Sequence, residues 1–233
     1  MDVDLLVHEA WPAYEVRAYE GWLLRHAGGV TKRANSVLPL GRPSDLGRAI
    51  LAAEDFYRER GLRCVFSVGP GAVRGLDEEL ERRGYEVVDP TVVMSGTPTG
   101  EPAPEVRIEE RPWPGWLETW WAVDGRYADG LAAAERICTG VPAWYAAYEE
   151  DGRALAVGRA VPQGETLGIF CMATLPVARR RGLARTVLRA LVACAGGGPA
   201  YLVVTERNAG ARALYRGEGF TATARYHYRA APL

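Results

Sequence analysis

The segment PVARRRGLARTVL, residues 176 to 188, constrains the possible folds of this chain more than any other part of its sequence. Pro176 ends an apolar run of strand length, and Gly182 begins a stretch whose apolar residues recur at helical spacing. The apolar face of that stretch consists of Leu183, Val187, Leu188, Leu191 and Val192. The segment therefore predicts a strand, a basic turn and a helix in direct succession.

The arginines at 179 to 181 lie at the N-terminus of the predicted helix. Backbone amides at that end already carry partial positive charge, so cations are unfavourable there unless an anion lies between them. Gly182 and Ala184 are small enough to let amides approach a phosphate closely. The alternative is a solvated basic turn, because Lys32 is the only lysine and arginine supplies the other basic residues. The spacing matches neither GxxxxGK[ST] nor GxGxxG, so it does not indicate ATP or a dinucleotide.

Length and composition exclude several classes of protein. The chain has 233 residues, enough for one large domain or two small ones. It is 48% hydrophobic and carries a net charge of -1, which fits a globular protein and disfavours a general binder of nucleic acid or anionic membrane. No apolar run reaches the length of a membrane helix, and the acidic N-terminus lacks the basic start of a signal peptide. We therefore expect a cytoplasmic protein.

Metal binding is not indicated by the cysteines and histidines. They are scattered, with no CxxC pair and no histidine close to a cysteine. We expect no metal and no disulfide, and interpret the cysteines as buried free thiols. The residues concerned are Cys64, Cys138, Cys171, Cys194, His8, His26 and His227.

The stretch SGTPTGEPAPEV, residues 95 to 106, has the composition of a linker. It divides the chain into two segments in which short strands, helix, strand, helix and strand follow one another. An Asp-Gly pair at 151 and 152, between two strand-like runs, predicts a β-hairpin. The predicted helices cover 2–10, 44–61, 76–84, 130–138 and 182–195, with others near 116–120 and from 208. The predicted strands cover 21–27, 33–40, 64–68, 85–95, 105–110, 143–150, 153–161, 166–174, 200–204 and 221–230.

The second segment resembles the GNAT superfamily of N-acetyltransferases. Arg179-x-x-Gly182-x-Ala184 is similar to the superfamily's R/Q-x-x-G-x-G/A signature, which holds the pyrophosphate of coenzyme A. ERNAGARALYRGEGF, residues 206 to 220, resembles the second coenzyme-A segment, N-x-x-A-x-x-L-Y-x-x-x-G-F. Its matching residues are Asn208, Ala211, Leu214, Tyr215, Gly219 and Phe220.

The resemblance implies an α+β (mixed α/β) fold of two GNAT-like halves, each a mixed, mostly antiparallel sheet flanked by helices. We expect a degenerate half over 1–95, a linker over 96–105 and an acetyl-CoA-binding half over 106–233. The turn LPLGRPSDLG in the first half lacks the signature spacing, so we expect no coenzyme A there. A tandem pair can mimic a dimer within one chain, which favours a monomer.

The resemblance also implies a reaction, the direct transfer of an acetyl group from acetyl-CoA to a primary amine. Tyr215 would be the general acid for the departing thiolate, and Asp124 and Tyr127 would contact the acceptor. The residues that would bind acetyl-CoA are Met172, Ala173 and Thr174 on the strand edge, Arg179, Arg180, Arg181, Gly182, Leu183, Ala184 and Arg185 in the cradle, and Asn208. Asn208 could equally serve as a helix N-cap.

No general base is indicated, because the predicted strand 166–174 contains no acid. The candidate carboxylates are Glu165, which precedes this strand, Glu206, just before Asn208, and Glu149 and Glu150, which end another strand. Each could instead be a solvated surface charge, and water is an alternative base. Cys171 could instead form an acetyl-cysteine intermediate. The acceptor could be a small molecule or a protein amino group. Two other functions stay open: a non-catalytic coenzyme-A-binding regulatory module and, disfavoured by the net charge, a nucleic-acid binder.

Overall fold

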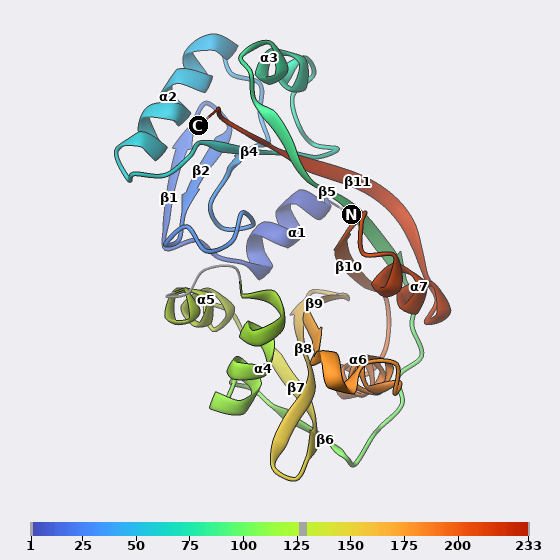
Figure 1. The fold of residues 1–233 in the computed structure, drawn as a ribbon. Helices are drawn as coiled ribbons and strands as arrows, with labels where there is room; N and C mark the ends of the chain where they lie inside the picture. Colours follow the sequence, from blue (N-terminus) through green and yellow to red (C-terminus); the bar gives the residue numbers. More distant parts are fainter. Residues whose placement is uncertain (1, 126–129, 233) are drawn as a thin grey trace. The chain divides into compact units, whose positions relative to one another are not determined.

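The computed structural model describes residues 2–125 and 130–232 of the chain (Figure 1). Its contacts divide into two compact units, each of mixed α and β structure. Unit 1 takes in Met1–Val92 and Ala224–Leu233, and unit 2 takes in Val93–Thr223. The units therefore do not follow one another simply along the chain, because the C-terminal residues belong with the first unit.

Unit 1 is built on a sheet in the order β1-β2-β3-β4-β11. The pair β3 and β4 is parallel and the other pairs are antiparallel. Its elements are α1 (Val3–Ala10), β1 (Glu15–Tyr19), β2 (Trp22–His26), β3 (Val37–Pro39), α2 (Leu46–Arg58), β4 (Val65–Val68) and α3 (Leu76–Arg82), with β5 (Glu86–Gly96) leading out of the unit and β11 (Phe220–Ala230) leading back in. The sequence did not predict β1, and residues 33 to 36 of a predicted strand form turns ahead of the short β3.

The core of unit 1 lies between the sheet and helices α2 and α3. Trp22 and Phe66 are fully buried and meet edge to face, with ring centroids 5.5 Å apart. The Trp22 indole nitrogen donates to the Gly41 carbonyl at 2.9 Å, so its polar group is satisfied inside the core. This core contains apolar and aromatic side chains of both helices, which explains the helical spacing in the sequence.

Unit 2 contains the sheet β10-β9-β8-β7-β6, in which β10 pairs with β9 in parallel and the other pairs are antiparallel. The predicted hairpin between β7 and β8 is confirmed, with Asp151 and Gly152 both at positive φ. The elements are β6 (Val106–Glu109), α4 (Pro114–Asp124), α5 (Leu131–Cys138), β7 (Trp144–Glu150), β8 (Arg153–Gln163), β9 (Thr166–Thr174), a 3-10 turn (Pro176–Ala178), α6 (Leu183–Cys194), β10 (Ala200–Thr205) and α7 (Ala209–Gly217).

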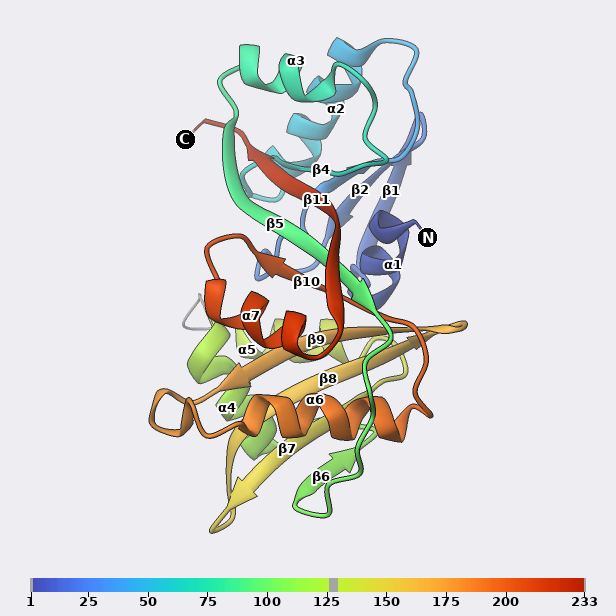
Figure 2. The ribbon, with the colours of Figure 1, turned by 90° about the vertical axis from the view of Figure 1, so that its right-hand side faces the viewer.

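Helices cover both faces of the unit 2 sheet. Helix α6 lies across one face of β7, β8 and β9, and α4 and α5 lie on the other (Figure 2). The apolar face predicted for α6 is buried. On the opposite face Trp116 is fully buried, and its indole nitrogen lies 3.1 Å from the Ala146 carbonyl oxygen. The sheet is therefore covered on both sides, and α6 is fixed with its N-terminus at the carboxyl end of β9.

Strands β5 and β11 each begin in one unit and end in the other. Strand β5 continues through Pro90, and Asp89 before it takes a left-handed conformation with φ of 47°. The linear division expected from the linker composition assigned all of 106–233 to one half. The structure groups Ala224–Leu233 with unit 1, and residues 93 to 105 with unit 2.

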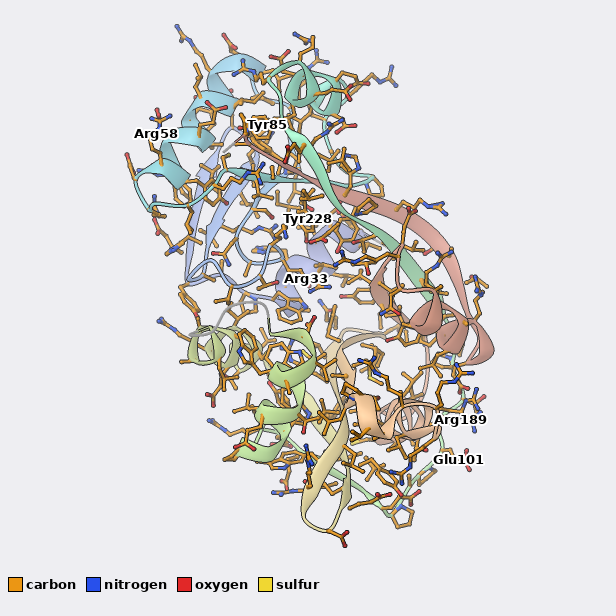
Figure 3. The ribbon with its side chains drawn as sticks, in the orientation of Figure 1. Arg33, Arg58, Tyr85, Glu101, Arg189 and Tyr228 are labelled. Atoms are coloured by element: carbon orange, nitrogen blue, oxygen red, sulfur yellow. The ribbon has the colours of Figure 1, made fainter. Side chains whose placement is uncertain are left out.

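The linker-like stretch is packed along α6. The Glu101 amide donates to the Arg189 carbonyl at 3.1 Å, and the Arg189 guanidinium donates to the Glu101 carboxylate at 2.8 Å (Figure 3). A Cβ atom added at Gly100 would lie 2.6 Å from the Ala193 nitrogen. Only glycine therefore allows the chain to approach the α6 backbone this closely.

Replacing Gly100 with alanine is expected to lower the free energy of unfolding by about 1–3 kcal/mol, because backbone atoms must move apart. Urea denaturation measures the change. Gly115→Ala is the matched control in the same unit. An added Cβ there would be no closer than 3.7 Å to Trp113, and a helical alanine should be neutral or stabilising. Equal effects of the two substitutions would contradict the close approach at Gly100.

Candidate functional site

Strands β9 and β10 separate after a short paired region. Their register joins Leu167, Gly168 and Ile169 of β9 to Ala200, Tyr201 and Leu202 of β10. Within the described residues the pairing stops there, although β9 continues to Thr174 and β10 to Thr205. The last residues of β9 therefore have backbone N–H and C=O groups, on the side away from β8, that can pair with another partner.

A β-bulge explains why β9 bends away from β10. The register with β8 shifts between Val157 and Arg159, so that Cys171 and Met172 lie opposite Gly158 alone. Cys171 takes a left-handed conformation with φ of 52°, as the extra residue of a bulge can. A Cβ added at Gly158 would lie 2.5 Å from the Met172 sulfur, so the glycine makes room for that side chain.

The basic turn after β9 forms a concave backbone. Arg180 and Gly182 both have positive φ, at 65° and 84°. The amides of Arg185 and Thr186 donate to the Gly182 carbonyl at 2.8 and 3.1 Å. The five preceding amides, residues 180 to 184, make no hydrogen bond to any residue that the structure describes. Such a row of unpaired amides at a helix N-terminus attracts an anion.

Helices α2 and α6, which follow strands β3 and β9, differ at their N-termini. Helix α6 has Gly182 as its N-cap and no side-chain cap. Helix α2 has Asp45, whose carboxylate accepts from the Arg48 amide at 3.0 Å. The Glu20 carboxylate accepts from the Ser44 amide at 2.6 Å, just before α2. The chain's own carboxylates therefore occupy the start of α2, whereas the start of α6 is open.

A cavity of about 840 Å³ lies where the open α6 N-terminus, the free edge of β9 and helix α7 meet. It is large enough for a sizeable organic ligand. The structure brings most of the predicted coenzyme residues to its lining: Met172, Ala173, Thr174, Arg179, Arg180, Gly182, Leu183, Ala184, Arg185, Asn208 and Tyr215.

Two predicted residues that the structure describes, Arg181 and Asp124, are not among those that line the cavity. Arg181 forms an ion pair with Glu150. Asp124 is the last residue of α4, directly after Val123, which does line the cavity. Tyr127 lies outside the described residues.

Sequence reasoning did not single out Val123, Ala178, Gly210 and Ala213 for the cavity. Gly210 and Ala213 could have been found, because they follow Asn208 on the same short helix and are small. Val123 belongs to α4, which is distant in sequence from the other lining residues, and no sequence pattern indicates that it lines the cavity.

Tyr215 lies on α7 and is almost buried, at 7% exposure, with its ring edge toward Phe220 at 6.0 Å between centroids. Burial raises the pKa of the Tyr215 hydroxyl well above its ordinary value, so the group keeps its proton at neutral pH. A neutral hydroxyl in a cavity wall can donate a hydrogen bond or a proton to a leaving group.

Asn208 is the N-cap of α7. Its side-chain oxygen accepts from the Ala211 amide at 3.1 Å. The side-chain nitrogen has no hydrogen-bond partner among the described residues, although the residue is exposed and lines the cavity. The amide can therefore cap the helix with one atom and contact a ligand with the other.

The four candidate bases lie outside the cavity lining. Glu149 accepts from the Trp113 indole at 3.0 Å. The hydrogen bond from Arg181 lowers the pKa of the Glu150 carboxyl, which makes it a weaker base. Glu165 lies in the turn before β9, at the other end of that strand, and Glu206 lies in the turn after β10. None of these carboxylates is among the residues that line the cavity.

A search of residues 2–125 and 130–232 finds no group of three side chains suited to hold a metal ion. The helices described there include none that is both long and apolar enough to cross a membrane.

The separated parallel strands, the bulge and the open helix N-terminus are those of a GNAT-type N-acetyltransferase. The chain belongs to the family described as "Probable histone acetyltransferase Rv0428c C-terminal", whose model matches residues 4–229. It is 27% identical over 241 residues to the "Uncharacterized N-acetyltransferase YobR" of Bacillus subtilis, and the match covers 97% of this chain and 96% of that protein.

Solved structures share the fold over the whole chain. A GCN5-related N-acetyltransferase from Kribbella flavida superimposes with a TM-score of 0.71 at 17% identity, covering 99% of this chain and 95% of that one. A tandem GNAT protein from the clavulanic acid biosynthesis pathway gives a TM-score of 0.61 at 11% identity, covering 100% of this chain and 89% of that one. At these identities the similarity shows the fold alone.

Proposed function

We propose that this chain transfers an acetyl group from acetyl-CoA to a primary amine, by direct attack in a ternary complex. One observation carries the proposal: the open α6 N-terminus and the free edge of β9 border the same cavity. The helix N-terminus suits a pyrophosphate, and the strand edge suits an arm that contains amide groups. Coenzyme A has both groups, joined in one molecule.

In this proposal the pyrophosphate binds the amides of residues 180 to 184. The guanidinium groups of Arg179, Arg180 and Arg185 add charge-assisted hydrogen bonds. Arg181 is held by Glu150, so we assign it a smaller role than its neighbours. The pantetheine arm extends along Met172, Ala173 and Thr174 as an added strand, which brings the thioester toward Tyr215 and Asn208.

Tyr215 is the proposed general acid for the departing thiolate. Desolvation raises the pKa of the Cys171 thiol, which disfavours the thiolate that an acetyl-cysteine route would need. Direct attack by the amine is therefore the favoured route. Since no carboxylate of residues 2–125 and 130–232 lines the cavity, we assign the amine's proton to water that leads to bulk solvent.

The acceptor is a primary amine, either of a small molecule or of a protein. Asp124 is the proposed contact for its positive charge, because it follows Val123 at the cavity wall. The family is described as a probable histone acetyltransferase, which makes a lysine side chain one acceptor to test. A small-molecule amine is the other.

Calorimetric titration with acetyl-CoA is expected to show one site per chain. Asp45 and Glu20 already occupy the N-terminus of α2, so unit 1 should not bind a second equivalent. A stoichiometry of two would contradict this difference between the units. Absence of binding at millimolar acetyl-CoA would refute the proposed function.

Thioester consumption with a panel of amines separates the enzyme from a non-catalytic coenzyme-A-binding module. Turnover with at least one amine is expected. Tight binding without turnover across both small-molecule amines and lysine peptides would favour the regulatory module instead.

A further inference from the structure

A buried carboxylate lies between two arginines behind the proposed phosphate site. Glu218 is in the turn between α7 and β11, and its side chain is only 3% exposed. Its Oε1 accepts from Arg185 Nε at 2.6 Å, and its Oε2 accepts from Arg189 Nε at 2.7 Å. Because the buried carboxylate accepts one charge-assisted hydrogen bond from each guanidinium, it fixes the orientation of both arginines.

The two arginines differ in what else they contact. Arg185 lines the cavity, and its side chain is 50% exposed. Arg189, one helical turn later on α6, does not line it and pairs with the carboxylate of Glu101 at 2.8 Å (Figure 3). Glu218 therefore connects an arginine of the site to an arginine of the scaffold.

The backbone around Glu218 is fixed by the same helix that carries Tyr215. The Glu218 amide donates to the Tyr215 carbonyl at 3.0 Å, and the Gly219 amide donates to the Arg216 carbonyl at 3.2 Å. The carboxylate and the cavity wall are thus parts of one rigid turn.

We propose that Glu218 is a positioning residue, which holds Arg185 by its Nε so that the two Nη groups face a phosphate of coenzyme A. This inference rests on the proposed function. Arginine loses substantial side-chain freedom when it binds a phosphate, and an arginine already held in place loses less. Glu218 would therefore strengthen binding of an anion, although it is itself negatively charged.

If Glu218 served only to balance the charge of the arginines, its substitution would change the affinity for coenzyme A in the opposite direction. Arg185 and Arg189 are four residues apart on α6, where like charges repel. If Glu218 only balanced these charges, Glu218→Gln would make the site more positive and tighten coenzyme A. If Glu218 positions Arg185, the same substitution weakens coenzyme A.

The test is calorimetric binding of coenzyme A to the full chain and to Glu218→Gln, Arg185→Gln and the double variant. We expect Glu218→Gln to raise Kd about fivefold to tenfold. The loss should disappear in the Arg185→Gln background, because the two residues act as one unit. A purely structural role would lower affinity in both backgrounds. Glu101→Gln is the matched control, since it removes an exposed carboxylate from Arg189 and should leave Kd unchanged.

If the wild-type chain binds coenzyme A and Glu218→Gln binds it with the same or a lower Kd, this inference is overturned and the proposed function is not. Absence of binding by the wild-type chain would overturn the proposed function and this inference with it. A second measurement is made on the wild-type chain and uses a variant only to assign one resonance. The Arg185 Nε–H resonance of the unmodified protein, identified by its loss in Arg185→Gln, should exchange slowly with water. Rapid exchange would show that Arg185 is not held and would also overturn the inference.

Discussion

Tyr215→Phe is expected to lower kcat by about 10²- to 10⁴-fold and to leave the Kd for acetyl-CoA nearly unchanged. The substitution removes only the hydroxyl, so the ring keeps its edge contact with Phe220. Burial raises the pKa of Tyr215 and keeps its proton in place, and the same desolvation raises the pKa of a thiol leaving beside it. The lost step is therefore protonation of the thiolate, which matters in the transition state and not in the ground state.

Steady-state kinetics and calorimetry on the same preparations separate these two effects. Tyr201→Phe is the matched control. Tyr201 is fully buried in the same unit, and its hydroxyl donates to the Gln163 side chain at 2.7 Å, but it does not line the cavity. Tyr201→Phe should lower the free energy of unfolding by about 1 kcal/mol and change kcat little. Equal kcat for Tyr215→Phe and the wild type would exclude Tyr215 as the general acid.

The local part of the site could be predicted from the sequence, because its signal lies in neighbouring residues. A strand, a basic turn and a helix with Gly182 as its N-cap follow one another between Thr166 and Cys194. Asn208 and Tyr215 belong to one short helix, so their spacing alone places them on a single element. The family resemblance then supplied the ligand, which the spacing alone could not.

Non-local features escaped prediction because nothing near them in sequence marks the partner. Glu218 meets Arg185 across 33 positions, and the sequence gives no reason to join them. The packing of Gly100 on α6 is similar, since a Pro- and Gly-rich stretch reads as a flexible linker until its contacts are known. The return of β11 to unit 1 depends on pairing with β4, which lies about 160 residues earlier in the chain.

The contrast between the two helix N-termini was predictable in part. The sequence shows that the unit 1 turn lacks the arginine signature, and Asp45 stands near the expected helix start. It does not show that Glu20, from the turn between β1 and β2, accepts from Ser44. Helix α2 begins with a carboxylate, whereas helix α6 has no side-chain cap. Introducing a carboxylate at the start of α6 would make its N-terminus resemble that of α2.

Ala184→Asp is expected to weaken acetyl-CoA binding by about 100-fold or more. Ala184 is the second residue of α6 and lines the cavity, so the new carboxylate would stand where the pyrophosphate is proposed to bind. Two unit charges 4 Å apart interact by about 4 kcal/mol at an effective dielectric constant of 20, and a factor of ten in Kd is about 1.4 kcal/mol. The same carboxylate should stabilise the helix by about 0.3–1 kcal/mol, because an acid in the first turn complements the positive end of α6.

The opposite signs of these two effects make the substitution informative. A general disturbance of the fold would lower Tm and weaken binding together, whereas occupation of the anion site raises or preserves Tm while binding is lost. Ala184→Asn is the matched control, with similar size and no charge, and it should weaken acetyl-CoA far less than Ala184→Asp. Since steric hindrance alone would affect both variants equally, equal losses would show that charge at the α6 N-terminus does not govern binding. Wild-type affinity in Ala184→Asp would place the pyrophosphate elsewhere.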